Sequence, residues 1–243
     1  MTTARVTERS GKNIGRSVGV LLFLHLAAGL TVPFILLNPV IAPPGFLTNA
    51  VVGPNRVRVA VLLLFVGSAI VIGIASTSWS FLRQYSSAMA LWLLALAIAS
   101  FSLQAVDNAH LLSMLSLSEA YAKAGAEKAD VFQALAVVVG SARRWSHYSF
   151  LLIVGSWIFL FCGLLYRFRL VPRALAVFGL VGSLLQIGGV TLRGLWGYPP
   201  ETRLAMPLAP AYMALALWLI VKGFDERHRT VEEHTPRAEV AAA

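Results

Sequence analysis

Charged residues are scarce in this sequence. Asp, Glu, Lys and Arg make up 13% of its 243 residues, whereas about a quarter of an average soluble domain is charged. The deficit is concentrated in long uncharged runs rather than spread along the chain. Several of these runs exceed the ~20 apolar residues that a helix needs to cross a hydrocarbon layer. The scarcity of charge therefore excludes a soluble globular domain and predicts a polytopic membrane protein.

Cysteine and the common catalytic motifs are almost absent. Cys162 is the only cysteine, so no disulfide can form within the chain. The sequence contains no HExxH, CxxC, GxSxG or phosphate-loop motif. These motifs are the usual signatures of zinc proteases, thiol oxidoreductases, serine hydrolases and nucleotide-binding enzymes. Enzymatic activity is therefore not favoured by the sequence.

Acidic residues are outnumbered by basic ones, which gives a formal net charge of +9. The Lys and Arg residues lie mostly at the ends of apolar runs, where membrane topology requires them. No basic cluster is interleaved with aromatic residues in the way that indicates a nucleic-acid surface. We therefore expect the lipid bilayer as the partner of this chain, and no nucleic acid.

The hydrophobic pattern predicts an all-α transmembrane bundle of about six spans. The expected spans cover residues 17–42, 57–79, 88–113, 145–166, 174–192 and 206–221. Pro33 and Pro39 lie within the first of these and predict a kink or an early ending of that helix. Residues 129–142 are too short for a span and stand next to Arg143 and Arg144, so they are interpreted as a helix at the membrane interface.

The polar ends of the chain flank a single transmembrane domain. Residues 1–16 form an N-terminal tail, residues 17–224 the helical domain, and the charged residues 225–243 a disordered C-terminal tail. With six spans, both tails and the loops on their side hold 12 Lys and Arg, against 8 in the other loops. The positive-inside rule then predicts that both termini are cytoplasmic.

Polar residues gather in the second half of the third span. Asp107 is the one acidic residue among eleven that lies within a span, ~29 Å from the start of that span at Ala88. Gln104 and His110 are each three residues from Asp107, so they lie on the same face of the helix, and Asn108 lies beside that face. The fourth span begins at a similar depth in the membrane. The candidate ligand-binding cluster is Gln104, Asp107, Asn108, His110, Arg144 and His147. We interpret it as a polar cavity between the third and fourth spans that binds or moves a small ligand.

Two other readings of the same residues stay open. Three histidines and a carboxylate form a known ligand set for a divalent metal, here His25, Asp107, His110 and His147. Two of the histidines are alternatively axial ligands of a haem, although neither cofactor is favoured. The plainest reading is that Asp107 pairs with Arg144 or a histidine and fixes helix packing. The protein would then be a structural accessory subunit.

Five blocks along the chain resemble an uncharacterised bacterial membrane family, named domain of unknown function 4386. The blocks are residues 115–126, 132–135, 142–147, 164–173 and 216–224, and the spacing between them agrees as well. The resemblance implies a protein with six or seven spans in the bacterial inner (plasma) membrane. It implies no activity, so it assigns no catalytic residue.

This chain matches the pattern of that family at one polar position and departs from it at another. His147 falls where the family often has a histidine. In the third span the family often has an Arg and a Glu three residues apart, whereas this chain has Gln104 and Asp107. Asp107 therefore lacks the arginine partner that the resemblance implies within its own helix, and its partner is expected on another one.

Overall fold

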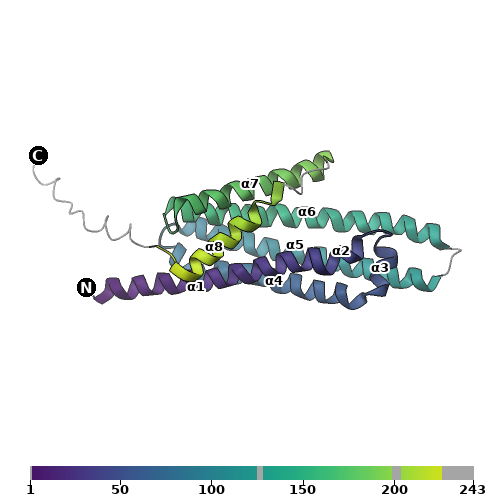
Figure 1. Ribbon diagram of the computed structural model, residues 1–243, viewed down its shortest axis with the longest axis horizontal. Helices are drawn as coiled ribbons and strands as arrows, with labels where there is room; N and C mark the ends of the chain where they lie inside the picture. Colours follow the sequence, from purple (N-terminus) through teal and green to yellow (C-terminus); the bar gives the residue numbers. More distant parts are fainter. Residues whose placement is uncertain (1, 125–127, 199–203, 226–243) are drawn as a thin grey trace, which may run out of the picture.

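The computed structural model describes residues 2–124, 128–198 and 204–225, and every regular element within them is a helix. Figure 1 shows the long helices side by side along the longest axis of the molecule. The elements are α1 (Thr2–Thr31), a π-helical segment η1 (Val32–Leu37), α2 (Asn38–Ile41), α3 (Phe46–Val52), α4 (Pro54–Leu82), α5 (Ser87–Ala124), α6 (Ala129–Arg167), α7 (Arg173–Trp196) and α8 (Leu208–Lys222).

Five stretches of these helices are long and apolar enough to cross a membrane. They are 11–41, α4, α5, α6 and α7, while the apolar helix α8 has only 15 residues. Arg173 and Arg193 lie twenty residues apart on α7, an interval of ~30 Å along a helix that matches the thickness of a hydrocarbon layer. The predicted all-α membrane bundle is confirmed, and the protein is a multi-pass membrane protein.

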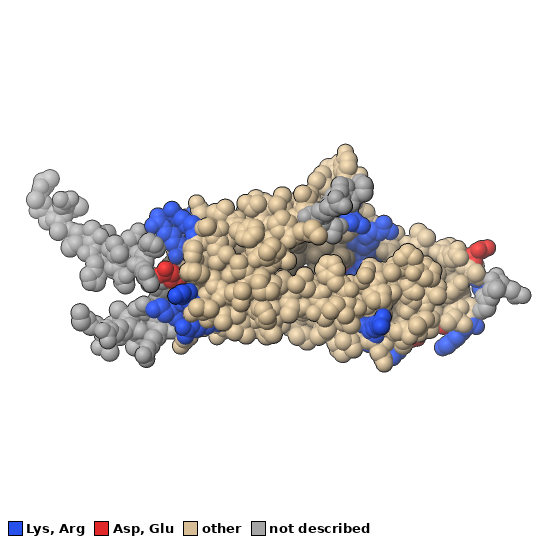
Figure 2. All heavy atoms as spheres, in the orientation of Figure 1, with Lys and Arg blue, Asp and Glu red and all other residues tan. Residues whose placement is uncertain are grey.

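The helices alternate in direction, so the bundle has two distinct ends. At one end, which we call the terminal face, α1 and α7 begin and α6 and α8 finish. Contacts tie these ends together, because Arg16 Nη2 donates to Val221 O over 3.4 Å and Asp225 N donates to Leu170 O over 2.8 Å. We call the opposite end, toward the α5–α6 turn, the hairpin face. Figure 2 shows Lys and Arg at both ends and a broad uncharged region between them.

Helices α5 and α6 are longer than a bilayer requires. They contain 38 and 39 residues, which correspond to ~57 and ~58 Å. Residues 129–142 are therefore the first part of α6, continuous with the fourth span, rather than a separate interfacial helix. No proline interrupts this stretch, and α6 packs extensively against α5. Both helices thus extend beyond the membrane at the hairpin face.

The segment between the first two spans packs onto this extension. Pro33 lies in η1, where the α-helical hydrogen-bond pattern gives way to a π-helical one, as expected for a residue without an N–H donor. The following connection, which the sequence indicates only as turn-rich, contains the short helix α3. Ser118 on α5 holds α3, because its hydroxyl donates to Leu47 O over 2.7 Å and accepts from Val51 N over 3.0 Å.

The structure describes the N-terminal tail but not the C-terminal one. Helix α1 begins at Thr2, so the N-terminal tail is continuous with the first span. Residues 226–243, the predicted disordered C-terminal tail, lie outside the described residues.

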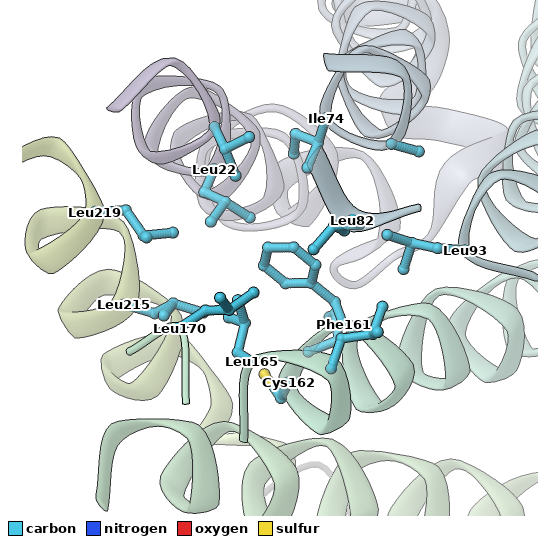
Figure 3. Close-up of a cluster of buried hydrophobic side chains, with 14 of the residues drawn as sticks. Leu22, Ile74, Leu82, Leu93, Phe161, Cys162, Leu165, Leu170, Leu215 and Leu219 are labelled. Carbon is cyan, nitrogen blue, oxygen red and sulfur yellow. The ribbon is translucent and has the colours of Figure 1, made fainter. Parts of the chain in front are cut away.

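The main hydrophobic core lies in the half of the bundle near the terminal face. Figure 3 shows Leu22, Ile74, Leu93, Phe161 and Leu215 converging from five different helices. Between helices in lipid, such contacts stabilise mainly through close van der Waals packing, because lipid tails are as apolar as the side chains. Small residues therefore matter wherever two helices approach closely.

Helices α1 and α8 approach each other closely. A Cβ at Gly19 would lie 2.6 Å from Ile220 N and 2.9 Å from Ala216 O. These are backbone atoms of α8, which cannot rotate away as a side-chain tip can. The missing side chain at Gly19 therefore allows the first and last helices to pack together and close the bundle.

We expect Gly19→Ala to lower the free energy of unfolding by about 1–3 kcal/mol, the usual cost of overpacking. The measurement is thermal unfolding of the detergent-purified protein. Gly29→Ala is the matched control on the same helix, since no atom lies within 4 Å of a Cβ at that position. Equal losses in the two variants would contradict close packing of α1 against α8.

Candidate functional site

Asp107 lies at the boundary between the spanning and the extended parts of α5. It stands twenty residues after Ser87, or ~30 Å along the helix, and none of its surface is exposed. An ionised Asp costs about 2.5–3.5 kcal/mol at the centre of a transmembrane helix and less near the interface. A buried carboxylate at this depth therefore needs partners.

Those partners come from α6 and from α5 itself. Ser146 Oγ donates to Asp107 Oδ1 over 3.1 Å, and Gln104 Nε2 donates to Oδ2 over 3.4 Å. Arg143 Nε lies 3.5 Å from Oδ1, and His147 Nδ1 lies 3.4 Å from Oδ2. The last two are within ion-pair range, but neither nitrogen is aligned as a hydrogen-bond donor. Asp107 is thus surrounded by donors on both oxygens.

The network continues from Asp107 to α4. Gln104 Nε2 also donates to Asn108 Oδ1 over 3.0 Å, and Asn108 Nδ2 donates to Val61 O over 3.3 Å. Gln104, Asp107 and Asn108 are all buried. One set of polar side chains therefore links α4, α5 and α6. We call it the α5–α6 polar site, consisting of Gln104, Asp107, Asn108, Arg143, Ser146 and His147.

The members of the site differ in how much solvent reaches them. The carboxylate of Asp107 is fully enclosed, whereas the side chains of Arg143 and His147 are 16% and 31% exposed. The accessible edge of the site is therefore made of basic side chains, and its enclosed centre is acidic.

Two predicted members of the cluster lie outside this site. Arg144 is exposed, and its Nη2 lies 3.5 Å from Ser141 Oγ. His110 is half-buried and has no hydrogen bond or ion pair within the described ranges. The arginine that contacts Asp107 is Arg143, the immediate neighbour of the predicted one.

Helical spacing on α6 explains which residues reach Asp107. Arg143, Ser146 and His147 are separated by three and four residues, so they share one face of the helix. Arg144 is turned by about 100° from that face. Arg144 is nevertheless three residues before His147, a spacing that also brings side chains together, so the sequence alone does not select Arg143 over Arg144.

A family model matches residues 17–223, which include the whole α5–α6 polar site. The chain belongs to the family described as Domain of unknown function (DUF4386). No curated protein and no solved structure matches it significantly. The DUF4386 assignment confirms the resemblance seen in the sequence, and because its description carries no activity, the chemistry has to be argued from the site.

The four residues proposed as metal ligands in this DUF4386 protein do not assemble. His25 on α1 places Nδ1 3.1 Å from Gly67 O, and its ring centroid is 6.0 Å from that of Tyr212. Within the part of the chain that the structure describes, no three His, Cys, Asp or Glu side chains gather in a group that could hold a metal ion. The pair Asp107 and His147 offers fewer protein ligands than the three or four of typical zinc sites.

We expect Asp107→Asn to lower the free energy of unfolding by about 2–4 kcal/mol, because it leaves the largely buried Arg143 without a counter-charge. Arg143→Gln in the same background should recover part of that loss. Thermal unfolding of the two single variants and the double variant measures the coupling between the residues.

The control pair is Arg58 and Glu119, which are 3.4 Å apart with side chains 56% and 40% exposed. Exposed pairs couple by less than about 1 kcal/mol. A coupling between Asp107 and Arg143 no larger than that of this control pair would contradict a buried ionic contact.

Proposed function

We propose that this protein binds a small anionic ligand, such as a carboxylate, at the accessible edge of the α5–α6 polar site. The observation that carries the proposal is the unequal exposure of the site: Asp107 is sealed, while Arg143 and His147 remain reachable. A ligand that approaches the site from solvent therefore meets basic groups first.

The positive charge of this edge favours a negatively charged ligand. Arg143 carries a permanent positive charge, and the exposed Arg144 stands beside it. A cation would be repelled before it reached Asp107. A carboxylate can accept from a guanidinium group in two parallel hydrogen bonds. Arg143 Nε and His147 Nδ1 are buried against Asp107, so the ligand would meet the exposed remainder of these two side chains.

The enclosed Asp107 then has a role of its own. Its carboxylate lies within 3.5 Å of both basic side chains, so a bound anion would compete with it for the charge of the same two side chains. Because the competing group is built into α5 and the donors are on α6, ligand binding would alter the contact between these two helices. This competition would make binding moderate and reversible, as suits a protein that takes up and releases its ligand.

The test measures thermal unfolding of the full-length, detergent-purified chain with increasing sodium acetate, succinate and citrate, against sodium chloride of equal ionic strength. At least one carboxylate should raise the midpoint of the wild type. Arg143→Gln should abolish that rise, because it removes the charged fork that the ligand would occupy. Arg58→Gln, at an exposed position, should retain it.

A rise that is equal in the wild type and Arg143→Gln would show non-specific salt stabilisation and contradict the proposal. No rise with any of the three carboxylates would do the same. The site would then serve only to hold the helices together. The hydrogen bond from Asn108 to Val61 O, which joins a third helix, favours this role. Loss of stability in Asp107→Asn without any ligand effect is the result expected for that accessory role.

We further propose that the protein lies in the plasma (inner) membrane with both termini cytoplasmic. The support is the excess of Lys and Arg on the side of the termini. The hairpin face would then lie outside the cell, and the α5–α6 polar site would be nearer to the outer surface of the membrane than to the inner one.

Cysteine labelling in intact bacterial cells tests this orientation. Cys162 is buried, so the native background is low. Val138→Cys lies on the extended part of α6, at a position 65% exposed, and should react with a charged, membrane-impermeant maleimide. Ser87→Cys, exposed at the terminal face, should react only after the cells are permeabilised. The reverse pattern would invert the orientation.

A further inference from the structure

A second polar site lies at the terminal face, far along α5 and α6 from Asp107. A cavity of about 380 Å³ opens there between the α6–α7 connection and the end of α8. Its walls carry two guanidinium groups, one carboxylate and one indole. The lining residues are Arg169, Val171, Pro172, Arg173, Trp218 and Asp225.

The wall of this cavity is held firmly by the buried part of the connection. Leu170 and Val171 are 0% and 3% exposed. Asp225 N donates to Leu170 O over 2.8 Å, which fastens the chain after α8 to the connection. Phe224 is fully buried, and its ring stacks on Phe81 at a centroid distance of 4.9 Å. The charged side chains thus stand on a fixed base rather than on a loose loop.

Arg169 adopts a backbone conformation that arginine rarely takes. Its φ is +52°, in the left-handed region that costs a non-glycine residue about 1 kcal/mol or more. Hydrogen bonds on either side hold it there, from Arg169 N to Tyr166 O over 3.3 Å and from Leu170 N to Leu165 O over 3.0 Å. Glycine would fit this turn at lower cost. What arginine adds at this position is a charged side chain in the wall of the cavity.

Arg173 adds a second charge that is also well positioned. Its guanidinium carbon lies 5.8 Å from the centroid of the Tyr166 ring, a cation–π contact that restricts the side chain. Arg173 is also the first residue of α7, with Pro172 as its N-cap. The positive end of the helix dipole therefore reinforces the charge of the guanidinium group.

Trp218 contributes a donor that needs an acceptor. Its indole Nε1 is buried and has no hydrogen-bond partner among the described residues. An indole nitrogen can only donate, so an oxygen atom that reached this nitrogen would satisfy it. Two guanidinium groups, a helix N-terminus and an indole N–H all favour a ligand rich in anionic oxygen. Asp225 offsets one positive charge, which leaves a net charge of +1 on the lining.

We propose that this cavity binds the phosphate group of a small ligand or of a phospholipid headgroup. A phosphodiester carries one negative charge, which balances the lining. Arg169 and Arg173 would hold its oxygens through charge-assisted hydrogen bonds. The cavity lies at the end of the spans, the level at which the phosphates of a bilayer are found. A phosphate from solution would have to enter the same cavity from the aqueous side.

Native mass spectrometry of the full-length chain in detergent tests the proposal. The probes are short-chain phosphatidylglycerol, short-chain phosphatidylethanolamine and inorganic phosphate, each added in increasing amounts. The wild type should retain one phosphate-bearing molecule more tightly than any further ones. Arg173→Gln should weaken that first binding step by ~10-fold, the loss expected for one charge-assisted contact. Arg83→Gln is the matched control, an exposed arginine at the same face but outside the cavity lining.

Arg169→Gly separates binding from folding. The substitution removes the charge and relieves the left-handed backbone, so the thermal midpoint should not fall while the first binding step weakens. Trp218→Phe keeps the ring packing and removes only the N–H donor, so it should also weaken binding without loss of fold. Equal binding by the wild type, Arg173→Gln and Arg169→Gly would overturn the proposal.

The choice of probe identifies the source of the phosphate. Displacement of bound lipid by inorganic phosphate at millimolar concentration would assign the cavity to a soluble phosphate ligand. Lipid binding that inorganic phosphate does not affect would assign it to a phospholipid headgroup. A preference for phosphatidylethanolamine that disappears in Asp225→Asn would place the ammonium group of that headgroup at Asp225. Failure of all three probes to bind the wild type would refute the proposal and leave the carboxylate site between α5 and α6 untouched.

Discussion

The buried carboxylate of Asp107 is the constraint on which the arrangement of α5 and α6 depends. An acidic group with no exposed surface at the edge of a hydrocarbon layer has to be surrounded by donors, or it cannot remain charged. Here the donors come from two helices, and Ser146, Arg143 and His147 meet the carboxylate only at one relative position of α6 along α5. The polar contacts thus set a register that apolar packing alone leaves loose.

The two ends of the bundle are built differently. Beyond Asp107, α5 and α6 continue out of the membrane as a hairpin, onto which α3 packs through Ser118. At the other end, the α6–α7 connection is short and fastened by the backbone bond between Leu170 and Asp225. The main apolar core contains no charged residue, and Figure 2 shows a broad uncharged surface between the two ends. The charged groups of the two proposed anion sites lie outside this apolar core, and each site keeps its basic side chains beside a carboxylate, Asp107 in one and Asp225 in the other.

Much of the fold follows from composition and hydrophobic length. Apolar runs separated by Lys and Arg define the spans, because a bilayer admits only helices whose backbone groups are satisfied internally. The ends of the helices were harder to foresee. Arg143 and Arg144 looked like a boundary, yet α6 passes through both, because Arg143 finds Asp107 and Arg144 remains at the surface. This basic pair therefore does not mark the end of the helix.

The sequence by itself determined the membrane bundle and the depth of its polar residues, since both depend on local chain properties of hydrophobicity and rise per residue. It also identified Asp107 as the group in need of a partner. Only the tertiary structure decided that the partner is Arg143 rather than Arg144, that His25 and His110 stay apart from Asp107, and that Arg169, Arg173 and Trp218 share a cavity. These choices depend on how far each helix is rotated and translated against its neighbours. Helix rotation is set by side-chain packing between segments distant in the sequence, which no local pattern contains.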